Sequence, residues 1–213
     1  MKKQLCSLLT ALALAVGLLP SAARAAENAP SFADVPAAAW YADAVQYAYE
    51  RGLMTGVSES EFAPDGTATR GQIVTILWRL AGSPVVNYAM RYADMDEGAW
   101  YGEAVRWAAS TGVVTGYTES SFGPNDAITR EQLAAILYRY IKTQGQGFTG
   151  MWYFPLRYDD AASISDWADE AMHWCVMKGI LSGTGADTLS PGMSTTRGQM
   201  AVMLMQFCQR NEK

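Results

Sequence analysis

The chain has 213 residues, of which 50% are apolar and 17% charged, and its formal net charge at pH 7 is −5. This length and apolar content are sufficient for a substantial hydrophobic core. Acidic residues outnumber basic ones, whereas binding to nucleic acid or to an anionic membrane requires a cationic surface. We therefore expect neither nucleic acid nor an anionic membrane as a partner.

Residues 1–25 predict a secretory signal peptide. Lys2 and Lys3 precede an apolar run from Leu5 to Leu19, and Ala23-Arg24-Ala25 forms a small-residue cleavage site. The apolar run is too short for a membrane span. We therefore expect a secreted mature chain that starts near Ala26, without membrane insertion, in which 13 basic residues stand against 21 acidic ones, a net charge of about −8.

An internal repeat organises the rest of the chain. The first two copies match without a gap at positions 60 residues apart, such as Trp40 and Trp100 or Pro64 and Pro124. The third copy is displaced by a longer linker and by one extra residue before Trp167. We expect repeats at 31–82, 91–142 and 157–209, with a glycine- and aromatic-rich linker at 143–156.

Each copy predicts a helix, a loop and a second helix. The first helix of the first copy has apolar residues at helical spacing and ends near Gly52. Its expected buried face is Ala44, Val45, Ala48, Tyr49 and Leu53. One helix pair cannot cover its own apolar face, so the three copies must pack on one another. The expected fold is one compact all-α domain of three pseudo-equivalent helix pairs.

A Thr-Arg pair opens the second helix of each copy. Thr69, Thr129 and Thr196 each precede a glutamine by three residues, a capping box that satisfies N–H groups at a helix start. The arginines that follow, Arg70, Arg130 and Arg197, are not explained by capping, because a cation there meets the positive end of the helix dipole. Beside free N–H donors, a guanidinium would form an anion site for a carboxylate or a phosphate. An ion pair with an acid of a neighbouring copy is the alternative, and spacing alone leaves both open.

The aromatic residues have a simpler interpretation. Trp40, Trp100 and Trp167 recur at the start of the first helix and are predicted to be core anchors, since buried aromatics dominate packing energy. The linker aromatics Trp152, Tyr153 and Phe154 either pack or contact a ligand, and packing is the expectation.

The sequence holds little material for catalysis. His173 is the only histidine, so neither a Ser-His-Asp arrangement nor a histidine metal site is expected. The acidic pairs at 94–97 and 159–160 lie in loops, where solvated carboxylates are usual. We expect no enzymatic activity, no metal and no cofactor; an enzyme with an unfamiliar carboxylate site is the weaker alternative. Cys175 and Cys208 are open to interpretation as a disulfide or as buried thiols.

The combined motif resembles a known family. Each copy has an aromatic-x-Asp, a tryptophan that opens the first helix, a Gly-x-x-x-Gly exit and the Thr-Arg-x-Gln segment, and three tandem copies resemble a complete S-layer homology (SLH) domain. The resemblance implies a pseudo-trimeric helical domain on the cell surface. Its inter-repeat grooves would bind secondary cell-wall polysaccharide, often pyruvylated, that is attached to peptidoglycan.

The resemblance also implies site residues. By position they are Arg70, Arg130, Arg197, Asp34, Asp94, Asp160, Gly56, Gly116 and Gly183. The arginines would meet the pyruvate carboxylate. The implied function is non-covalent anchoring at the cell wall; the alternative is surface-layer assembly or binding of a surface protein without direct glycan contact.

Three departures from the family pattern bear on the sites. Glutamine replaces the usual glutamate in each Thr-Arg segment, and Gly71 and Gly198 replace the usual alanine. In the third copy Ala168 stands where the others have Tyr41 and Tyr101. We therefore expect the sites of Arg70 and Arg130 to be better preserved than that of Arg197.

Overall fold

The computed structural model describes residues 32–211, so the predicted signal peptide lies outside the described residues. Six α-helices form the domain: α1 (Ala42–Glu50), α2 (Arg70–Leu80), α3 (Gly102–Ser110), α4 (Arg130–Thr143), α5 (Asp169–Met177) and α6 (Arg197–Asn211). Two 3₁₀ turns, η2 (Ala161–Ser163) and η3 (Asp166–Ala168), precede α5. The described part of the chain contains no β-sheet, which confirms the all-α prediction. None of its helices is long and apolar enough to span a membrane.

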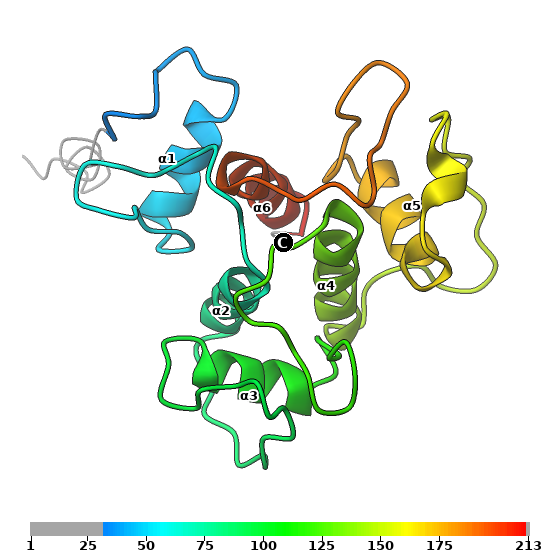
Figure 1. Ribbon diagram of the computed structural model, residues 1–213. Helices are drawn as coiled ribbons and strands as arrows, with labels where there is room; N and C mark the ends of the chain where they lie inside the picture. Colours follow the sequence, from blue (N-terminus) through cyan, green and yellow to red (C-terminus); the bar gives the residue numbers. More distant parts are fainter. Residues whose placement is uncertain (1–31, 212–213) are drawn as a thin grey trace, which may run out of the picture.

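The helices form a closed ring of three pairs (Figure 1). The second helices of the repeats, α2, α4 and α6, surround the centre, and α1, α3 and α5 lie outside them. The main packing pairs are α3 on α2, α5 on α4 and α1 on α6. Each first helix therefore packs on the second helix of the preceding repeat, and the contact of α1 with α6 closes the ring. The predicted helix pairs exist, but each takes its helices from two repeats.

The segments before the three central helices meet at the pseudo-threefold axis. The Ala68 N–H donates to the Thr195 carbonyl at 2.9 Å, the Ile128 N–H to the Ala68 carbonyl at 3.0 Å, and the Thr195 N–H to the Ile128 carbonyl at 2.8 Å. These three residues are fully buried. The result is a closed ring of three hydrogen bonds, so the backbone groups of the axis satisfy one another.

The helix boundaries follow the predicted signals. Thr69 and Thr129 form complete capping boxes with Gln72 and Gln132, and the same two bonds join Thr196 and Gln199. Gly52 has φ of 65° just beyond α1, a left-handed conformation that glycine adopts at little cost. The predicted face of α1 is buried apart from Tyr49, which is half-buried against the core. Cys175 and Cys208 are both buried and are not joined in a disulfide, and burial raises the pKa of Cys175.

Three residues that depart from the family pattern lie at the interfaces between repeats: Gly71, Gly198 and Ala168. At each interface the residue on one side fits the size of the residue that faces it on the other side. A Cβ at Gly71 would lie 3.4 Å from the Tyr101 ring, and one at Gly198 would lie 3.2 Å from the Tyr41 ring. At the third interface the tyrosine is replaced by Ala168. There, Glu131 occupies the position of the glycine and accepts hydrogen bonds from the Ser165 N–H at 3.0 Å and the Ser165 hydroxyl at 3.1 Å. Two interfaces thus pair glycine with tyrosine, and the third pairs glutamate with alanine. Ala168 therefore belongs to the interface of Arg130. Arg197 lies at an interface that keeps its tyrosine, Tyr41, which corrects the expectation that the Arg197 site is the less preserved one.

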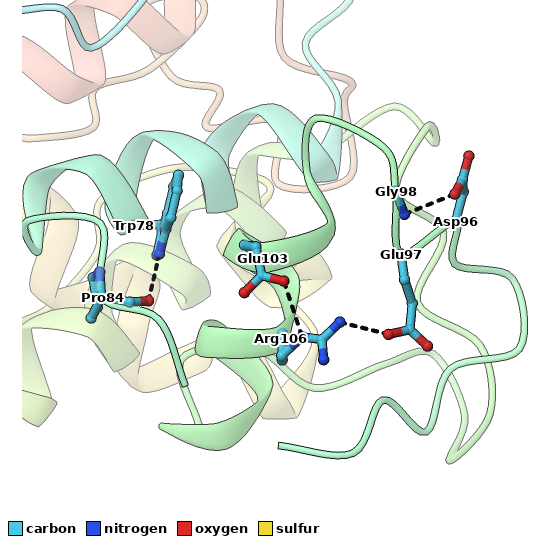
Figure 2. A network of polar contacts seen from close by, with 7 residues as sticks. All are labelled: Trp78, Pro84, Asp96, Glu97, Gly98, Glu103 and Arg106. Carbon is cyan, nitrogen blue, oxygen red and sulfur yellow. Dashed lines mark hydrogen bonds and ion pairs between the residues drawn. The ribbon is translucent and has the colours of Figure 1, made fainter. Parts of the chain in front are cut away.

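Polar contacts fix the chain between α2 and α3 and the outer face of α3 (Figure 2). Arg106 on α3 donates to Glu97 at 2.5 Å and lies 3.5 Å from Glu103, while the Gly98 N–H donates to the Asp96 carboxylate at 2.9 Å. The Trp78 indole N–H donates to the Pro84 carbonyl at 2.9 Å. These bonds hold the segments that enter α3 and leave α2.

The linker packs on the third repeat through its first aromatic residues. Trp152 stacks on Phe148 with ring centroids 4.2 Å apart and lies 5.2 Å from His173. The Phe148 N–H donates to the Tyr138 hydroxyl, which donates to Glu170 at 2.7 Å; burial and this acceptor raise the pKa of Tyr138 to about 12. The packing prediction is confirmed for Trp152 and is wrong for Tyr153, which is 88% exposed, while Phe154 is half-buried.

The hydroxyl of Thr195 supplies a test of the central ring. It is buried and has no hydrogen-bond partner within residues 32–211. We expect Thr195→Val to raise the free energy of unfolding by about 1 kcal/mol, because it removes an unsatisfied polar group. Urea denaturation measures this. The matched control is Thr75→Val, whose hydroxyl donates to the Gly71 carbonyl at 2.9 Å and whose loss should destabilise the domain. A destabilised Thr195→Val would contradict the assignment of the Thr195 hydroxyl as a buried group without a partner.

The compensating interfaces predict non-additive substitutions. Ala168→Tyr places a ring against Glu131 and should destabilise the domain by about 1–3 kcal/mol. Glu131→Gly alone leaves Ser165 without its acceptor. The double variant reproduces the glycine–tyrosine interface, so we expect it to be more stable than the sum of the single changes by at least about 1 kcal/mol. A double-mutant cycle in urea measures this coupling, and strict additivity would refute it.

Candidate functional site

Three open grooves lie between the repeats and share one construction. Each combines an arginine from one repeat, the loop and second helix of the next repeat, and a tryptophan from the third. Groove A is lined by Arg70, Thr115, Gly116, Tyr117, Gln132, Ala135, Ile136, Arg139 and Trp167. Groove B includes Arg197, Thr55, Gly56, Val57, Gln72, Arg79 and Trp100, and groove C includes Arg130, Ser182, Gly183, Thr184, Gln199 and Trp40. Their volumes of about 300, 410 and 380 Å³ suit a short segment of ligand.

Each arginine of the Thr-Arg pairs reaches the loop of the next repeat. Arg70 donates from Nε to the Phe122 carbonyl at 2.9 Å and from Nη2 to the Thr115 carbonyl at 3.2 Å. The equivalent bonds join Arg130 to Leu189 and Ser182, and Arg197 to Phe62 at 2.9 Å and Thr55 at 2.7 Å. All three arginine residues are buried. The side chains therefore fix the loop that forms one wall of each groove.

The predicted aspartates hold the same loops from within their own repeat. The Asp94 carboxylate accepts from the N–H groups of Phe122 and Gly123, the first of these at 2.9 Å. Asp34 does the same with Phe62 and Ala63, and Asp160 with Leu189 and Ser190. One residue in each loop thus gives its N–H to an aspartate and its carbonyl to an arginine of the preceding repeat. The three aspartates do not line the grooves, so the geometry gives them a positioning role.

The ion-pair alternative for the three arginines finds no support among the described residues. Within residues 32–211, none of the three makes a salt bridge with a carboxylate. Burial lowers their pKa values, and in groove B the charge of Asp34 acts against this effect on Arg197. The guanidinium bonds to loop carbonyls were not anticipated from the sequence, because spacing shows neither the ring order of the repeats nor the loop that each arginine meets.

The helix starts do not offer the free N–H donors that the sequence suggested. The Arg70 N–H donates to the Asp126 carbonyl at 3.1 Å and the Gly71 N–H to the Pro124 carbonyl at 2.8 Å. The helices α4 and α6 make the same bonds to the turns of the neighbouring repeats. An anion in these grooves would therefore meet the arginine side chain and not the backbone donors, which corrects that part of the anion-site argument.

The predicted glycines are required by the shape of the loops. A Cβ at Gly116 would lie 2.3 Å from the Ser121 carbonyl oxygen and 2.6 Å from the Tyr92 ring. Gly56 is equally confined, and Gly183 nearly so. These residues also line the grooves, so a larger side chain would disturb both the loop fold and the groove wall.

The recurring tryptophans are not core anchors, and that prediction was wrong. Trp40, Trp100 and Trp167 are 66%, 59% and 53% exposed, and each lines a groove. Trp40 and Trp100 meet the tyrosine that follows them edge to face, with centroids 5.2 Å apart, and it is this tyrosine that packs inward. Their position before the apolar stripe, and not within it, was the available signal for exposure.

The chain belongs to the S-layer homology domain family. The family's sequence profile matches residues 31–74, 91–134 and 157–201, which are the three repeats. The chain is 30% identical over 95% of its length to an endoglucanase of Bacillus sp. (strain KSM-635), and 28% identical over its whole length to an S-layer protein of Bacillus thuringiensis subsp. finitimus. It is 26% identical over 81% of its length to an amylopullulanase of Thermoanaerobacterium thermosulfurigenes. The chain spans only 22%, 24% and 9% of these relatives, and the family associates it with the cell surface.

The aspartate bonds predict loss of stability in acid. Burial, the largest influence on Asp94, raises its pKa, but the Phe122 and Gly123 N–H donors and the Ser121 hydroxyl together hold the pKa below the ordinary value. A carboxylate with a lowered folded-state pKa stabilises the fold above the unfolded pKa, and this contribution is lost as pH falls through the folded value. We expect unfolding free energy to decline as pH drops below about 4.

Substitution of Asp94 tests this effect, because it removes the carboxylate. Asp94→Asn should be less stable at pH 7, and its stability should change less between pH 5 and pH 2.5 than that of wild type. Asp65→Asn removes an exposed carboxylate of the loop in the first repeat and controls for net charge. Chemical denaturation at fixed pH values measures both, and equal acid profiles for Asp94→Asn and wild type would contradict the assigned role.

Proposed function

We propose that the chain anchors non-covalently to the cell wall by binding secondary cell-wall polysaccharide in grooves A, B and C. The observation that carries this proposal is the threefold recurrence of one groove that contains an exposed tryptophan, an arginine and polar loop backbone. An exposed indole offers an apolar face to a sugar ring, and such aromatic side chains supply large contact area at low conformational cost. The surrounding polar groups provide orientation.

The arginine chemistry supports an acidic glycan. A guanidinium has five N–H donors, and the loop carbonyls use Nε and Nη2. In each of the three arginines Nη1 makes no hydrogen bond within residues 32–211, which leaves it for a ligand. A carboxylate is the matching acceptor, and a pyruvate ketal on a sugar carries one. The proposed ligand is therefore a pyruvylated secondary polymer attached to peptidoglycan.

Repetition supplies the strength of the attachment. One charge-assisted hydrogen bond contributes about 1.5–3 kcal/mol, so one groove holds a sugar only weakly. A polymer with repeated units engages several grooves, and the second contact benefits from a high effective concentration. In the longer relatives, which include enzymes, the region similar to this chain would act as the attachment module of a protein whose activity lies elsewhere.

The exposed tryptophans allow a test that leaves the fold intact. We expect the triple variant Trp40→Ala, Trp100→Ala, Trp167→Ala to lose at least about tenfold in binding to peptidoglycan sacculi that retain the secondary polymer, since truncation of a binding tryptophan removes a main contact. Co-sedimentation of residues 26–213 measures the binding, and circular dichroism checks the fold. Tyr153→Ala, which removes an exposed aromatic outside the grooves, is the control.

Sacculi stripped of the secondary polymer complete the experiment. Wild type should fail to bind them. If wild type binds stripped sacculi equally well, or if the triple variant binds like wild type, glycan recognition in the grooves is refuted. An assembly or protein-interaction role would then take its place.

A further inference from the structure

The three grooves share a frame, which consists of the Thr-Arg arginine and the loop that it holds, but they differ in charge. Nine residues after each Thr-Arg arginine, the second helix carries Arg79 in α2, Arg139 in α4 and Gln206 in α6. Arg139 lines groove A together with Arg70, and Arg79 lines groove B together with Arg197. Among the described residues, Arg130 is the only arginine that lines groove C. The equivalent position of α6 is Gln206, which accepts a hydrogen bond from Arg210 at 3.1 Å.

Arg139 is the more buried of the two additional groove arginines, since Arg79 is exposed. Its side chain is half-buried and forms no hydrogen bond or ion pair within residues 32–211. Burial lowers its pKa, and its charge in turn lowers the pKa of Arg70, so the two cations act on each other within groove A. Tyr117 and Asp126 raise the pKa of Arg70, but neither forms a hydrogen bond or an ion pair with Arg139 within the described residues. A ligand with negative charge would relieve this repulsion.

Groove A also has the more aromatic lining. Tyr117 lies in its loop, is 50% exposed, and has its ring centroid 4.4 Å from the Arg70 guanidinium carbon. The equivalent loop residue is Val57 in groove B and Thr184 in groove C. Groove A therefore combines two arginines with Tyr117 and Trp167, and groove C combines one arginine with a single aromatic residue, Trp40.

We propose that groove A is the primary site and binds a two-sugar segment that carries an anionic group on each sugar, one facing Arg70 and the other Arg139. Groove B, with two arginines and one aromatic residue, is the secondary site for the same segment. Groove C binds a segment with one anionic group. This inference rests on the proposed function, and it adds that the grooves differ in ligand charge and are filled in order.

Synthetic disaccharides of N-acetylated hexosamines that carry no, one or two pyruvate ketals test the charge assignment. Each groove has its own tryptophan, so the indole N–H signals of Trp167, Trp100 and Trp40 in ¹H–¹⁵N spectra report the three grooves separately. We expect the doubly ketalated disaccharide to shift Trp167 at the lowest concentration, then Trp100, and Trp40 last.

Substitution of the second arginine is the decisive comparison. Arg139→Gln should weaken binding of the doubly ketalated disaccharide in groove A about tenfold, the loss expected for one charge-assisted contact, and change binding of the singly ketalated one by less than about twofold. Gln206→Arg is the matched gain of charge and should strengthen binding of the doubly ketalated disaccharide in groove C at least fivefold. Circular dichroism verifies the fold of both variants.

The outcomes separate this inference from the proposed function. If Arg139→Gln weakens both disaccharides equally, or if Trp40 responds first, the charge assignment is overturned while glycan anchoring stands. If no groove tryptophan responds to any disaccharide but sacculi are bound, the proposed ligand class is wrong. Failure to bind sacculi as well would refute the proposed function itself.

Discussion

The architecture depends on one residue in each loop whose backbone N–H and carbonyl are both held by side chains of other segments. In the second repeat the Phe122 N–H donates to Asp94 of its own repeat, and its carbonyl accepts from Arg70 of the preceding one. Because the arginine is buried, its desolvation is offset only if these carbonyl bonds form, so docking of two repeats and ordering of the loop are one event. The loop is also a groove wall, so the proposed binding surface is formed by the contact between repeats.

The closed ring extends this dependence to the whole domain. Each outer helix packs on the central helix of the preceding repeat, and α1 on α6 joins the beginning of the described chain to its end. Every groove draws its arginine, its loop and its tryptophan from three different repeats. No repeat can therefore form a groove by itself, and all three repeats are needed to build each one.

Within this common frame the repeats have diverged in a coordinated way. The interface that has Glu131 and Ala168 replaces the glycine–tyrosine contact of the other two with hydrogen bonds to Ser165, so shape and polarity change together. The groove linings differ at Arg139, Arg79 and Tyr117, none of which makes the aspartate or arginine bonds that hold the loops. Frame residues preserve the architecture, and lining residues are free to distinguish one groove from another.

The sequence by itself determined the local features of this protein. The capping threonines, the terminal glycines and the apolar stripes act through neighbours within one or two helical turns, so the repeats, the helices and the family pattern of Arg70 or Gly116 were visible from spacing alone. The tertiary structure decided which repeat each arginine reaches, that the helix N–H donors are already used, and that Trp40, Trp100 and Trp167 face solvent. It also showed that Arg139 and Arg79 share grooves with arginines from other repeats. These features depend on the order in which the repeats close the ring, and no spacing within a single repeat contains that information.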